Sequence, residues 1–323
     1  MFILRNSYIL LFLFISIKTS ANIKNHSRRF HLGLTTASPS YQLSFTPEEV
    51  STEQKVNFRP NILGLGGYRL TLFGFTLTYL EDAIRNEKDD IKFGKTSYED
   101  IRLSTYWGNK EQWYINGYYT RYKGLYIDNS EEIDSNLSSI DPKIYNEDLE
   151  VFNAGGAILY TFKPSEYSLA AAYSQTSQQK KSGGSWLIRL SSDSTLIKDS
   201  TAIIPTQVRT LYGTDQNLIK TQFVSTTFQG GYGYTVVLSN FFLNLQGLYG
   251  VGIQNRKWTN EGEKNQSSNT NISKLSLWAA LGYNGDDFFL TIKHLNDETK
   301  YETKSINIFS NLSWLQLDLG VRF

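Results

Sequence analysis

The stretch QKKSGGS at residues 179–185 contains residue types that are suited to binding a solute. It interrupts an alternating apolar segment with two cations, two hydroxyl groups and two glycines. The glycines allow a strand to bend, which would turn the lysines and serines toward an anionic or polar solute. A hairpin tip or bulge that serves folding alone is the alternative interpretation. The predicted ligand-binding residues in this stretch are Gln179, Lys180, Lys181, Ser182, Gly183, Gly184 and Ser185.

Three arginines, Arg59, Arg102 and Arg189, complete the set of predicted ligand-binding residues. Each occupies the phase of an alternating segment that we expect to face an interior. Asp100 and Asp318 occupy the same phase of their own segments. We therefore expect a lining that carries both signs of charge, rather than a track for anions alone.

The chain offers few residues for catalysis or metal binding. It contains no Cys and three His, which excludes thiolate nucleophiles and Cys-ligated metals. Because His26 and His31 lie near the N-terminus, only His294 is left for a catalytic triad or a two-His metal site inside a barrel. We expect His294 to lie at a strand end near a polar interface. We predict no catalytic residue, no metal, no cofactor and no enzymatic activity.

The N-terminus has the features of a secretory signal peptide. Arg5 precedes the apolar stretch YILLFLFISI, and TSA at residues 19–21 offers small side chains for cleavage after Ala21. Residues 1–21 are therefore the predicted signal peptide and residues 22–323 the mature domain. Removing Arg5 and Lys18 from 32 basic and 31 acidic residues leaves one net negative charge, so no basic excess for nucleic acid remains.

The remaining sequence favours a β-barrel. It has no apolar run of about 18 residues that could form a membrane helix, so only a closed barrel could span a membrane. Segments of about ten residues alternate between apolar and polar side chains, which is typical of such barrels. Aromatic residues make up 14% of the chain, and this suits many strands. Twelve strands are predicted, near residues 40–46, 55–69, 72–81, 98–107, 111–122, 149–162, 166–190, 219–238, 240–254, 272–284, 286–295 and 304–323.

The predicted connections alternate between long and short. Short turns in the periplasm and long loops outside are the arrangement of outer-membrane barrels. The predicted fold is therefore an all-β transmembrane antiparallel β-barrel of about 12 strands with short periplasmic turns and long extracellular loops. The long connections include residues 191–218 and 256–271. The short ones are LTL at 70–72, GNKE at 108–111, KPSE at 163–166, SN at 239–240 and NGD at 284–286.

The final strand has the pattern of a membrane-facing strand. Its alternate residues from Leu315 to Val321 are apolar, and the chain ends on Phe323. This pattern is similar to the C-terminal signal that the barrel-assembly machinery reads in outer-membrane proteins. The preceding apolar residues, in SINIFSN, fall in the opposite phase, so we expect a bulge or break near residues 311–313.

Several stretches resemble an uncharacterised bacterial family, domain of unknown function 4421. They include FRPNILGLGGYRL, QQKKSGGSW, GGYGYT, FFLNLQGLYGVG, ALGYNGDDFF and GVRF, and together they span residues 55–323. The resemblance implies an outer-membrane β-barrel and leaves the activity open.

The sequence supports two functions of different classes. The first is a narrow channel or uptake pore for a small polar or amphiphilic solute, because about twelve strands leave room for one file of solute or for a plugged lumen. The alternative is a structural or surface-interaction barrel whose loops bind an external partner. Both place the protein in the bacterial outer membrane, with outer-membrane lipid and the barrel-assembly machinery as partners.

Overall fold

The computed structural model describes residues 23–48, 55–139 and 141–323. The predicted signal peptide, residues 1–21, lies outside the described residues. Within the described part of the chain, no helix is long and apolar enough to span a membrane.

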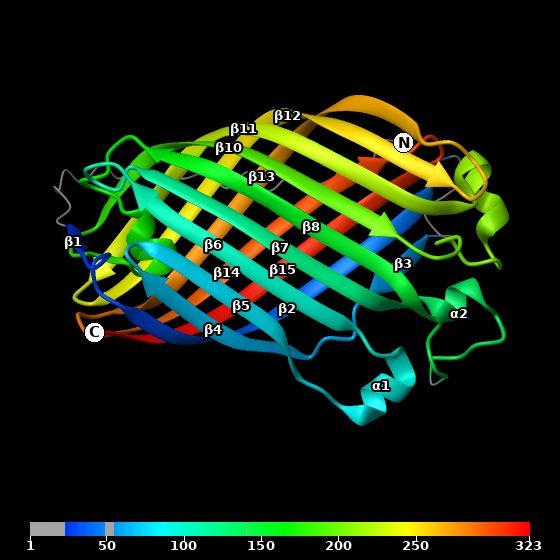
Figure 1. Cartoon of the computed structure of the whole chain (residues 1–323), viewed down its shortest axis with the longest axis horizontal. Helices are drawn as coiled ribbons and strands as arrows, with labels where there is room; N and C mark the ends of the chain where they lie inside the picture. The colour runs from blue at the N-terminus through cyan, green and yellow to red at the C-terminus, as the bar shows by residue number, and fades with distance from the viewer. Residues whose placement is uncertain (1–22, 49–54, 140) are drawn as a thin grey trace, which may run out of the picture.

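Twelve antiparallel strands form a closed ring, which we call the wall (Figure 1). Each strand pairs with the next one in the ring, and β15 closes it by pairing with β2 along its whole length. The predicted barrel class and strand number are confirmed. The wall strands are β2 (His31–Pro47), β4 (Gly64–Leu72), β5 (Phe75–Ile84), β6 (Ser97–Trp107), β7 (Trp113–Ile127), β8 (Tyr145–Thr161), β10 (Gly183–Lys198), β11 (Leu218–Leu238), β12 (Phe241–Asn260), β13 (Gln266–Asn284), β14 (Phe288–Glu302) and β15 (Ile306–Arg322).

Shorter elements lie outside the ring of twelve. β3 (Val56–Arg59) pairs with both β2 and β7 beyond the ends of the shorter strands β4 to β6. β1 (Ile23–Asn25) and β9 (Ser177–Gln179) form a separate two-stranded sheet. The helical segments are α1 (Glu87–Phe93), α2 (Ser130–Ile133), η2 (Ala170–Ser174) and η3 (Arg209–Asp215).

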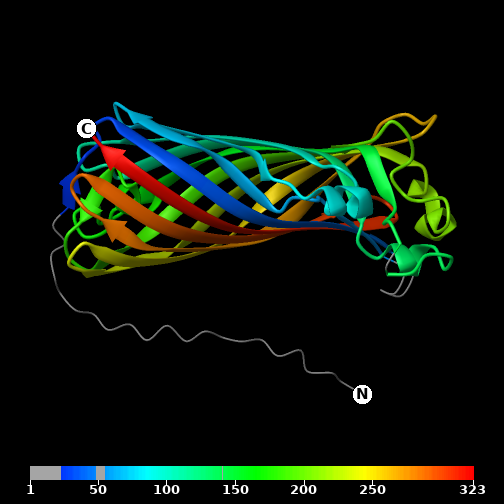
Figure 2. The same ribbon diagram turned by 90° about the horizontal axis from the view of Figure 1, so that it is seen from below.

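The two ends of the barrel differ in their connections. The end with the short turns also holds β1 and the C-terminal Phe323, and we call it the turn end (Figure 2). The other end, with α1, α2 and η3, is the loop end. The turn between β4 and β5 lies at Phe73 and Gly74, both with positive φ, rather than at residues 70–72. Positive φ at both central residues matches the twist of a hairpin.

The β12–β13 connection corrects one sequence prediction. Residues 256–271 were expected to form a long loop, but β12 runs to Asn260 and β13 starts at Gln266. β14 also continues to Glu302. Both strand extensions are polar on their outward face, so the alternation used for prediction is missing there.

Side chains alternate across the wall as a membrane barrel requires. Leu245 points outward with 45% of its surface exposed, whereas its neighbour Gln246 points into the lumen and is 7% exposed. Large apolar side chains point outward from the wall strands, forming a band that starts at the turn end. Hydrocarbon on the outside and polar groups inside account for this pattern.

β15 runs without the bulge expected near residues 311–313. Its registers with β14 and β2 are continuous from Ile306 to Val321. Ile306 and Ile308 are buried because they point inward, while Leu315 and Leu319 point outward. The change of apolar phase therefore marks a change of environment along one regular strand. Apolar side chains fill the lumen near the loop end.

Candidate functional site

The connection from β8 to β10 enters the lumen at the turn end. KPSE at 163–166 was predicted as the tight connection between two strands and residues 166–190 as one strand. KPSE does form a turn, in which the backbone N–H of Glu166 donates to the carbonyl of Lys163, but it does not connect two wall strands, and residues 166–182 lie outside the wall strand β10. Residues 162–182 instead form a connection that contains η2 and β9. Its central part, residues 167–179, is almost entirely buried, and we call this part the plug.

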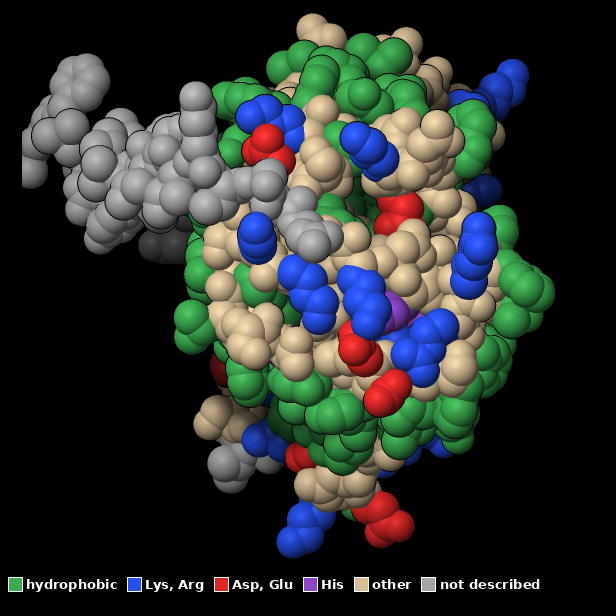
Figure 3. Space-filling model, turned by 90° about the vertical axis from the view of Figure 1, so that its left-hand side faces the viewer, with side chains coloured by type: hydrophobic (Ala, Val, Ile, Leu, Met, Phe, Trp, Pro, Cys, Tyr) green, Lys and Arg blue, Asp and Glu red, His purple; other side chains and the backbone are tan. Residues whose placement is uncertain are grey.

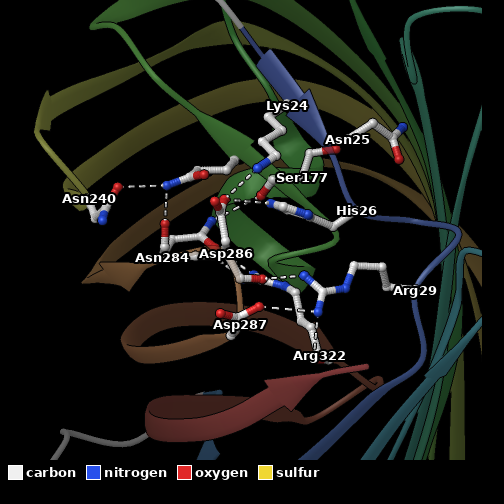
Figure 4. A network of polar contacts seen from close by, with 12 residues as sticks. Lys24, Asn25, His26, Arg29, Ser177, Asn240, Asn284, Asp286, Asp287 and Arg322 are labelled. Carbon is white, nitrogen blue, oxygen red and sulfur yellow. Dashed lines mark hydrogen bonds and ion pairs between the residues drawn. The ribbon is translucent and has the colours of Figure 1, made fainter.

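Hydrogen bonds from the wall hold the plug. Arg322 Nη2 donates to the carbonyl of Gln175 at 2.6 Å and to Asn284 Oδ1 at 2.5 Å. Asn284 Nδ2 donates to the carbonyl of Ser177 at 2.9 Å, and Gln178 Nε2 donates to Asn240 Oδ1 at 3.0 Å (Figure 4). These contacts join the plug to β15 and to two turns of the wall.

The N-terminal segment covers the plug from outside. β1 pairs with β9, and the backbone N–H of His26 donates to the carbonyl of Thr176 at 2.8 Å. Lys24 Nζ lies 2.7 Å from Asp286 Oδ1 in the β13–β14 turn. In the view onto this end, basic side chains gather near the centre and apolar side chains occupy much of the rim (Figure 3).

Two ionisable groups at this end have shifted pKa values. Burial, together with the positive charges of Arg322 and Lys24, lowers the pKa of His26 to about 4. The hydrogen bond from Lys24 lowers the pKa of Asp286. At neutral pH, a neutral imidazole and an ionised carboxylate therefore lie side by side over the plug.

A buried charge cluster lies where the plug meets the wall. Asp318 Oδ2 accepts from Lys293 Nζ at 2.5 Å and from Arg69 Nη1 at 3.0 Å. Both cations also reach the plug, since Lys293 donates to the carbonyl of Tyr173 at 2.6 Å and Arg69 donates to Gln175 Oε1 at 3.0 Å. Asp318 thus balances part of the charge of two cations that bond to the plug backbone and side chains.

Above the plug lies a cavity of about 480 Å³. Its floor includes Tyr114, Tyr173 and Trp278, with ring centroid distances of 5.1 Å from Tyr114 to Tyr173 and 4.4 Å from Tyr173 to Trp278. The ring of Tyr106, which does not line the cavity, lies 5.0 Å from that of Tyr114. Tyr173 belongs to the plug, and the other three rings belong to the wall. The plug therefore supplies part of the floor of the cavity.

Apolar side chains form the roof of the cavity, and we call this group the apolar cap. Tyr301 and Trp314 both line the cavity and belong to the same buried cluster as the cap. The cap is sealed from the loop end by η3, where the Tyr212 hydroxyl donates to the carbonyl of Phe45 at 3.0 Å. Its fully buried members include Leu43, Phe45, Phe58, Ile127, Ile197, Ile203, Ile204, Tyr212, Phe223, Ile306 and Ile308.

Two of the predicted arginines line the cavity. Arg102 forms an ion pair with Asp100 at 2.7 Å and lies over the Trp314 ring, 4.2 Å from its centroid. Arg189 also lines the cavity, and its Nε is buried with no hydrogen-bond partner among the described residues. The predicted inward orientation of both arginines is confirmed, while their role in binding stays a prediction.

The expected lumen position of the other candidates is largely wrong. Arg59 lies near the loop end, 3.3 Å from Asp128, and does not line the cavity. Lys180 and Lys181 are exposed at the turn end, where the chain leaves the plug. The expected bend into the lumen occurs earlier, at the plug itself.

The remaining residues of the QKKSGGS stretch serve the structure of the plug exit. Gln179 is buried, and its Oε1 accepts from the backbone N–H of Ser168 at 3.1 Å. The hydroxyls of Ser182 and Ser185 accept from the backbone N–H groups of Val237 and Lys163, both at 2.9 Å. Gly183 and Gly184 begin β10, and a Cβ on Gly184 would lie 2.7 Å from the carbonyl oxygen of Gly233.

The sequence interpretation missed the residues of the plug that form the floor. Tyr173 and Gln175 were assigned to a strand, because the apolar residues before them fit an alternating pattern. The three consecutive alanines at 170–172 were the signal against a strand, since alanine is depleted in strands.

The described residues form no candidate metal centre. They contain no group of three or more His, Asp or Glu side chains that could hold a metal ion. His294 points outward from β14, opposite Ala279 and Leu315 in the wall. His26 and His31 are buried at the turn end.

Solved outer-membrane barrels are similar to the chain in fold alone. The outer membrane protease OmpT from Escherichia coli is 6% identical, with 93% of this chain and 98% of that chain covered and a TM-score of 0.40. The attachment invasion locus protein Ail of Yersinia pestis, in complex with the heparin analogue sucrose octasulfate, is 10% identical, with 91% and 99% covered and a TM-score of 0.21. The Pseudomonas putida toluene transporter TodX is 6% identical, with 91% and 90% covered and a TM-score of 0.28.

The sequence matches none of the curated proteins. Residues 20–323 match the family described as Domain of unknown function (DUF4421). The chain therefore belongs to this uncharacterised family, whose member here is a twelve-stranded antiparallel barrel with a plug and an internal cavity.

Proposed function

We propose that the protein is a bacterial outer-membrane barrel that takes up a small polar or amphiphilic solute through its central cavity. The observation that carries this proposal is the cavity of about 480 Å³, which is large enough for a small organic molecule. The plug below it is held by polar contacts that water can replace. Movement of the plug would connect the cavity to the turn end.

The outward apolar band supports the proposed location in the membrane. Leu245 lies in this band on β12, whereas Ser267 points outward from β13 beyond it, opposite Lys257. An arginine in place of Leu245 should cost about 2–4 kcal/mol of folding stability in lipid, and Ser267→Arg should cost about 0–1 kcal/mol. Urea titration of both variants in vesicles measures this difference. Equal costs would argue against hydrocarbon around the band.

The turn end then faces the periplasm and the loop end the exterior, as in outer-membrane barrels. Outer-membrane lipid and the barrel-assembly machinery, which would read Phe323, are the partners that this proposal requires. We propose no catalytic activity and no cofactor for this function. The surface-interaction barrel remains the alternative prediction.

Locking the plug tests the uptake proposal. Because the chain has no native cysteine, the pair Gln178→Cys and Asn240→Cys can join the plug to the β11–β12 turn, where these two side chains are in contact. The pair Asn255→Cys and Asn269→Cys, opposite each other on β12 and β13, is the matched control within the wall.

We expect a small conductance of the unmodified protein in planar bilayers. Oxidation of the plug pair should lower it at least ten-fold, reduction should restore it, and the control pair should leave it unchanged. A protein that stays silent under all voltages, or conducts equally with the plug locked, would overturn the proposed uptake through a movable plug.

A further inference from the structure

The wall is split between β13 and β14 toward the loop end. These strands pair only from Leu277 with Asn296 to Asn284 with Phe289 within the described chain, which is 8 residue pairs. β13 keeps 18 pairs with β12, and β14 keeps 15 pairs with β15. The two hairpins therefore remain intact while their shared ladder ends, and they diverge toward the loop end (Figures 1 and 2).

The cavity reaches this split. Residues 270–274 of β13 and residues 299–302 of β14 line it consecutively. Where a barrel wall is closed, only alternate residues of a strand face the interior. Runs of five and four consecutive lining residues, at positions where the β13–β14 ladder has no pairs, therefore indicate strand edges that are open toward the cavity.

The split begins where the outward apolar side chains of β13 and β14 end. Leu275 and Leu277 are the last large apolar side chains on the outer face of β13, and Asn271 and Ser273 follow them. On β14, the outward residue Ile292 is followed by the exposed His294. An amphiphile in the membrane would hold its polar group at this level, next to the split.

The charges around the cavity favour an anion. Seven Lys or Arg and three Asp or Glu side chains line it, and the buried Asp100 and Asp318 behind the lining still leave the cations in excess. Two ion pairs bridge the divergent hairpins, Lys274 with Asp297 at 3.1 Å and Arg256 with Glu302 at 3.0 Å. Arg189 has no ion pair among the described residues.

Arg189 lies at the level of the aromatic floor. It pairs with Leu159 of β8, which pairs on its other side with Tyr114 of β7, and Arg189, Tyr114 and Tyr173 line the same cavity. The ring of Trp278 contacts Tyr173, and its Nε1 is buried without a hydrogen-bond partner among the described residues. A cation next to aromatic faces fits a molecule with one acid group and an apolar body.

We propose that the solute is an amphiphilic organic anion, which enters sideways through the β13–β14 split and binds with its acid group at Arg189. This inference rests on the proposed uptake function and names its substrate class and entrance. The apolar body of the solute lies against Tyr173 and Trp278. The plug and the apolar cap close the two ends of the cavity, and the split leads into it from the side.

Equilibrium binding tests the substrate class. The full-length barrel in detergent is titrated by calorimetry with naphthalene-2-carboxylate, with 2-naphthylmethylammonium and with 2-naphthol. We expect the anion to bind at least ten-fold tighter than the cation. Arg189→Gln should weaken the binding of the anion at least ten-fold and leave the binding of 2-naphthol unchanged. Arg121→Gln removes an outward cation that pairs with Glu150 and is the matched control, expected to bind like the wild type.

Cross-linking tests the entrance. If the β13–β14 ladder continued, Ser273 would lie opposite Lys300, so Ser273→Cys and Lys300→Cys can be joined by a short bismaleimide across the split. The pair Asn255→Cys and Asn269→Cys is the control across an intact ladder. We expect the association rate constant of naphthalene-2-carboxylate to fall at least ten-fold for the first pair alone.

Three results would overturn the inference: equal binding of the cation and the anion, unchanged binding of the anion to Arg189→Gln, or equal association rates for both cross-linked pairs. These outcomes are independent of the plug-lock experiment. A barrel that binds the anion through the split but shows no conductance would refute the proposed uptake and leave this binding site standing.

Discussion

The two ends of the lumen are closed by opposite chemistry. At the turn end, the plug is held by hydrogen bonds and charges from Arg322, Arg69 and Lys293. At the loop end, the apolar cap is packed from fully buried side chains such as Phe45 and Phe223. Polar contacts can be exchanged for water at little net cost, whereas apolar packing cannot. The comparison supports the proposal that the plug is the end that opens and that the cap stays closed.

The largest expected effect lies in the cap. Phe45→Ala should lower the free energy of unfolding by about 3–5 kcal/mol, because it leaves a cavity among fully buried side chains. Phe309→Ala, on the adjacent strand but 44% exposed, is the control and should change stability by about 0.5 kcal/mol or less. Urea unfolding followed by tryptophan fluorescence measures both. Similar losses for the two variants would show that the cap is loosely packed.

A plug contact should give a smaller effect that is confined to the plug. Arg322→Gln removes charged hydrogen bonds to Gln175 and Asn284, so local opening should become easier by about 2–3 kcal/mol, or roughly 30- to 150-fold in hydrogen exchange of residues 170–179. Arg29 donates a hydrogen bond to the β13–β14 turn and none to the plug, so Arg29→Gln is the control. Unchanged exchange of the plug in Arg322→Gln would mean that the charge network does not hold it.

Acid should loosen the same end. Unfolded His26 takes up a proton near pH 6.5, whereas in the folded protein, near Arg322, Lys24, Arg29 and Asp286, it stays neutral down to about pH 4. Its contribution is therefore complete above pH 6.5 and is lost as the pH falls from 6.5 to 4. The protection factors of β1 and β9 should fall by up to roughly 300-fold over this range. His26→Gln should flatten this dependence. A variant with the same pH slope as the wild type would assign the effect to another group.

The smallest effect is expected for the outermost ion pair. Lys24 and Asp286 are each about half exposed, with 49% and 52% of their side chains accessible. Lys24→Gln should cost about 0.2–1 kcal/mol of local stability at low salt and less at high salt. Hydrogen exchange of β1 at two salt concentrations checks this. A loss that is large and independent of salt would show that Lys24 holds the plug by another route.

The wall was largely predictable from the sequence, and the contents of the lumen were not. The number of strands and the outward direction of their apolar side chains followed from the alternation wherever the outer face of a strand is apolar, as at Leu243 and Leu245. Alternation failed at residues 256–271, where β12 and β13 carry polar outward side chains beyond the band. The alternation also led to a wrong prediction at residues 306–313. Apolar residues that point inward into the cap have the sequence phase that a bulge would give to outward apolar residues.

The candidate site was predicted only in part for a related reason. Arg102 and Arg189 lie on regular strands, so their phase gave their direction. Lys180 and Lys181 follow the plug, whose return into the lumen depends on partners such as Asn240 and Arg322, 60 or more residues away in sequence. Local sequence carries no record of such contacts.

The sequence by itself determined a ring of twelve strands with an apolar outer face and with Arg102 and Arg189 turned inward, because successive side chains of a strand point to opposite faces. The tertiary structure alone decided that residues 167–179 fill the turn end, that apolar side chains seal the loop end and that the β13–β14 ladder stops at Leu277. These features depend on which distant segments meet once the barrel closes, and on the volume left between them.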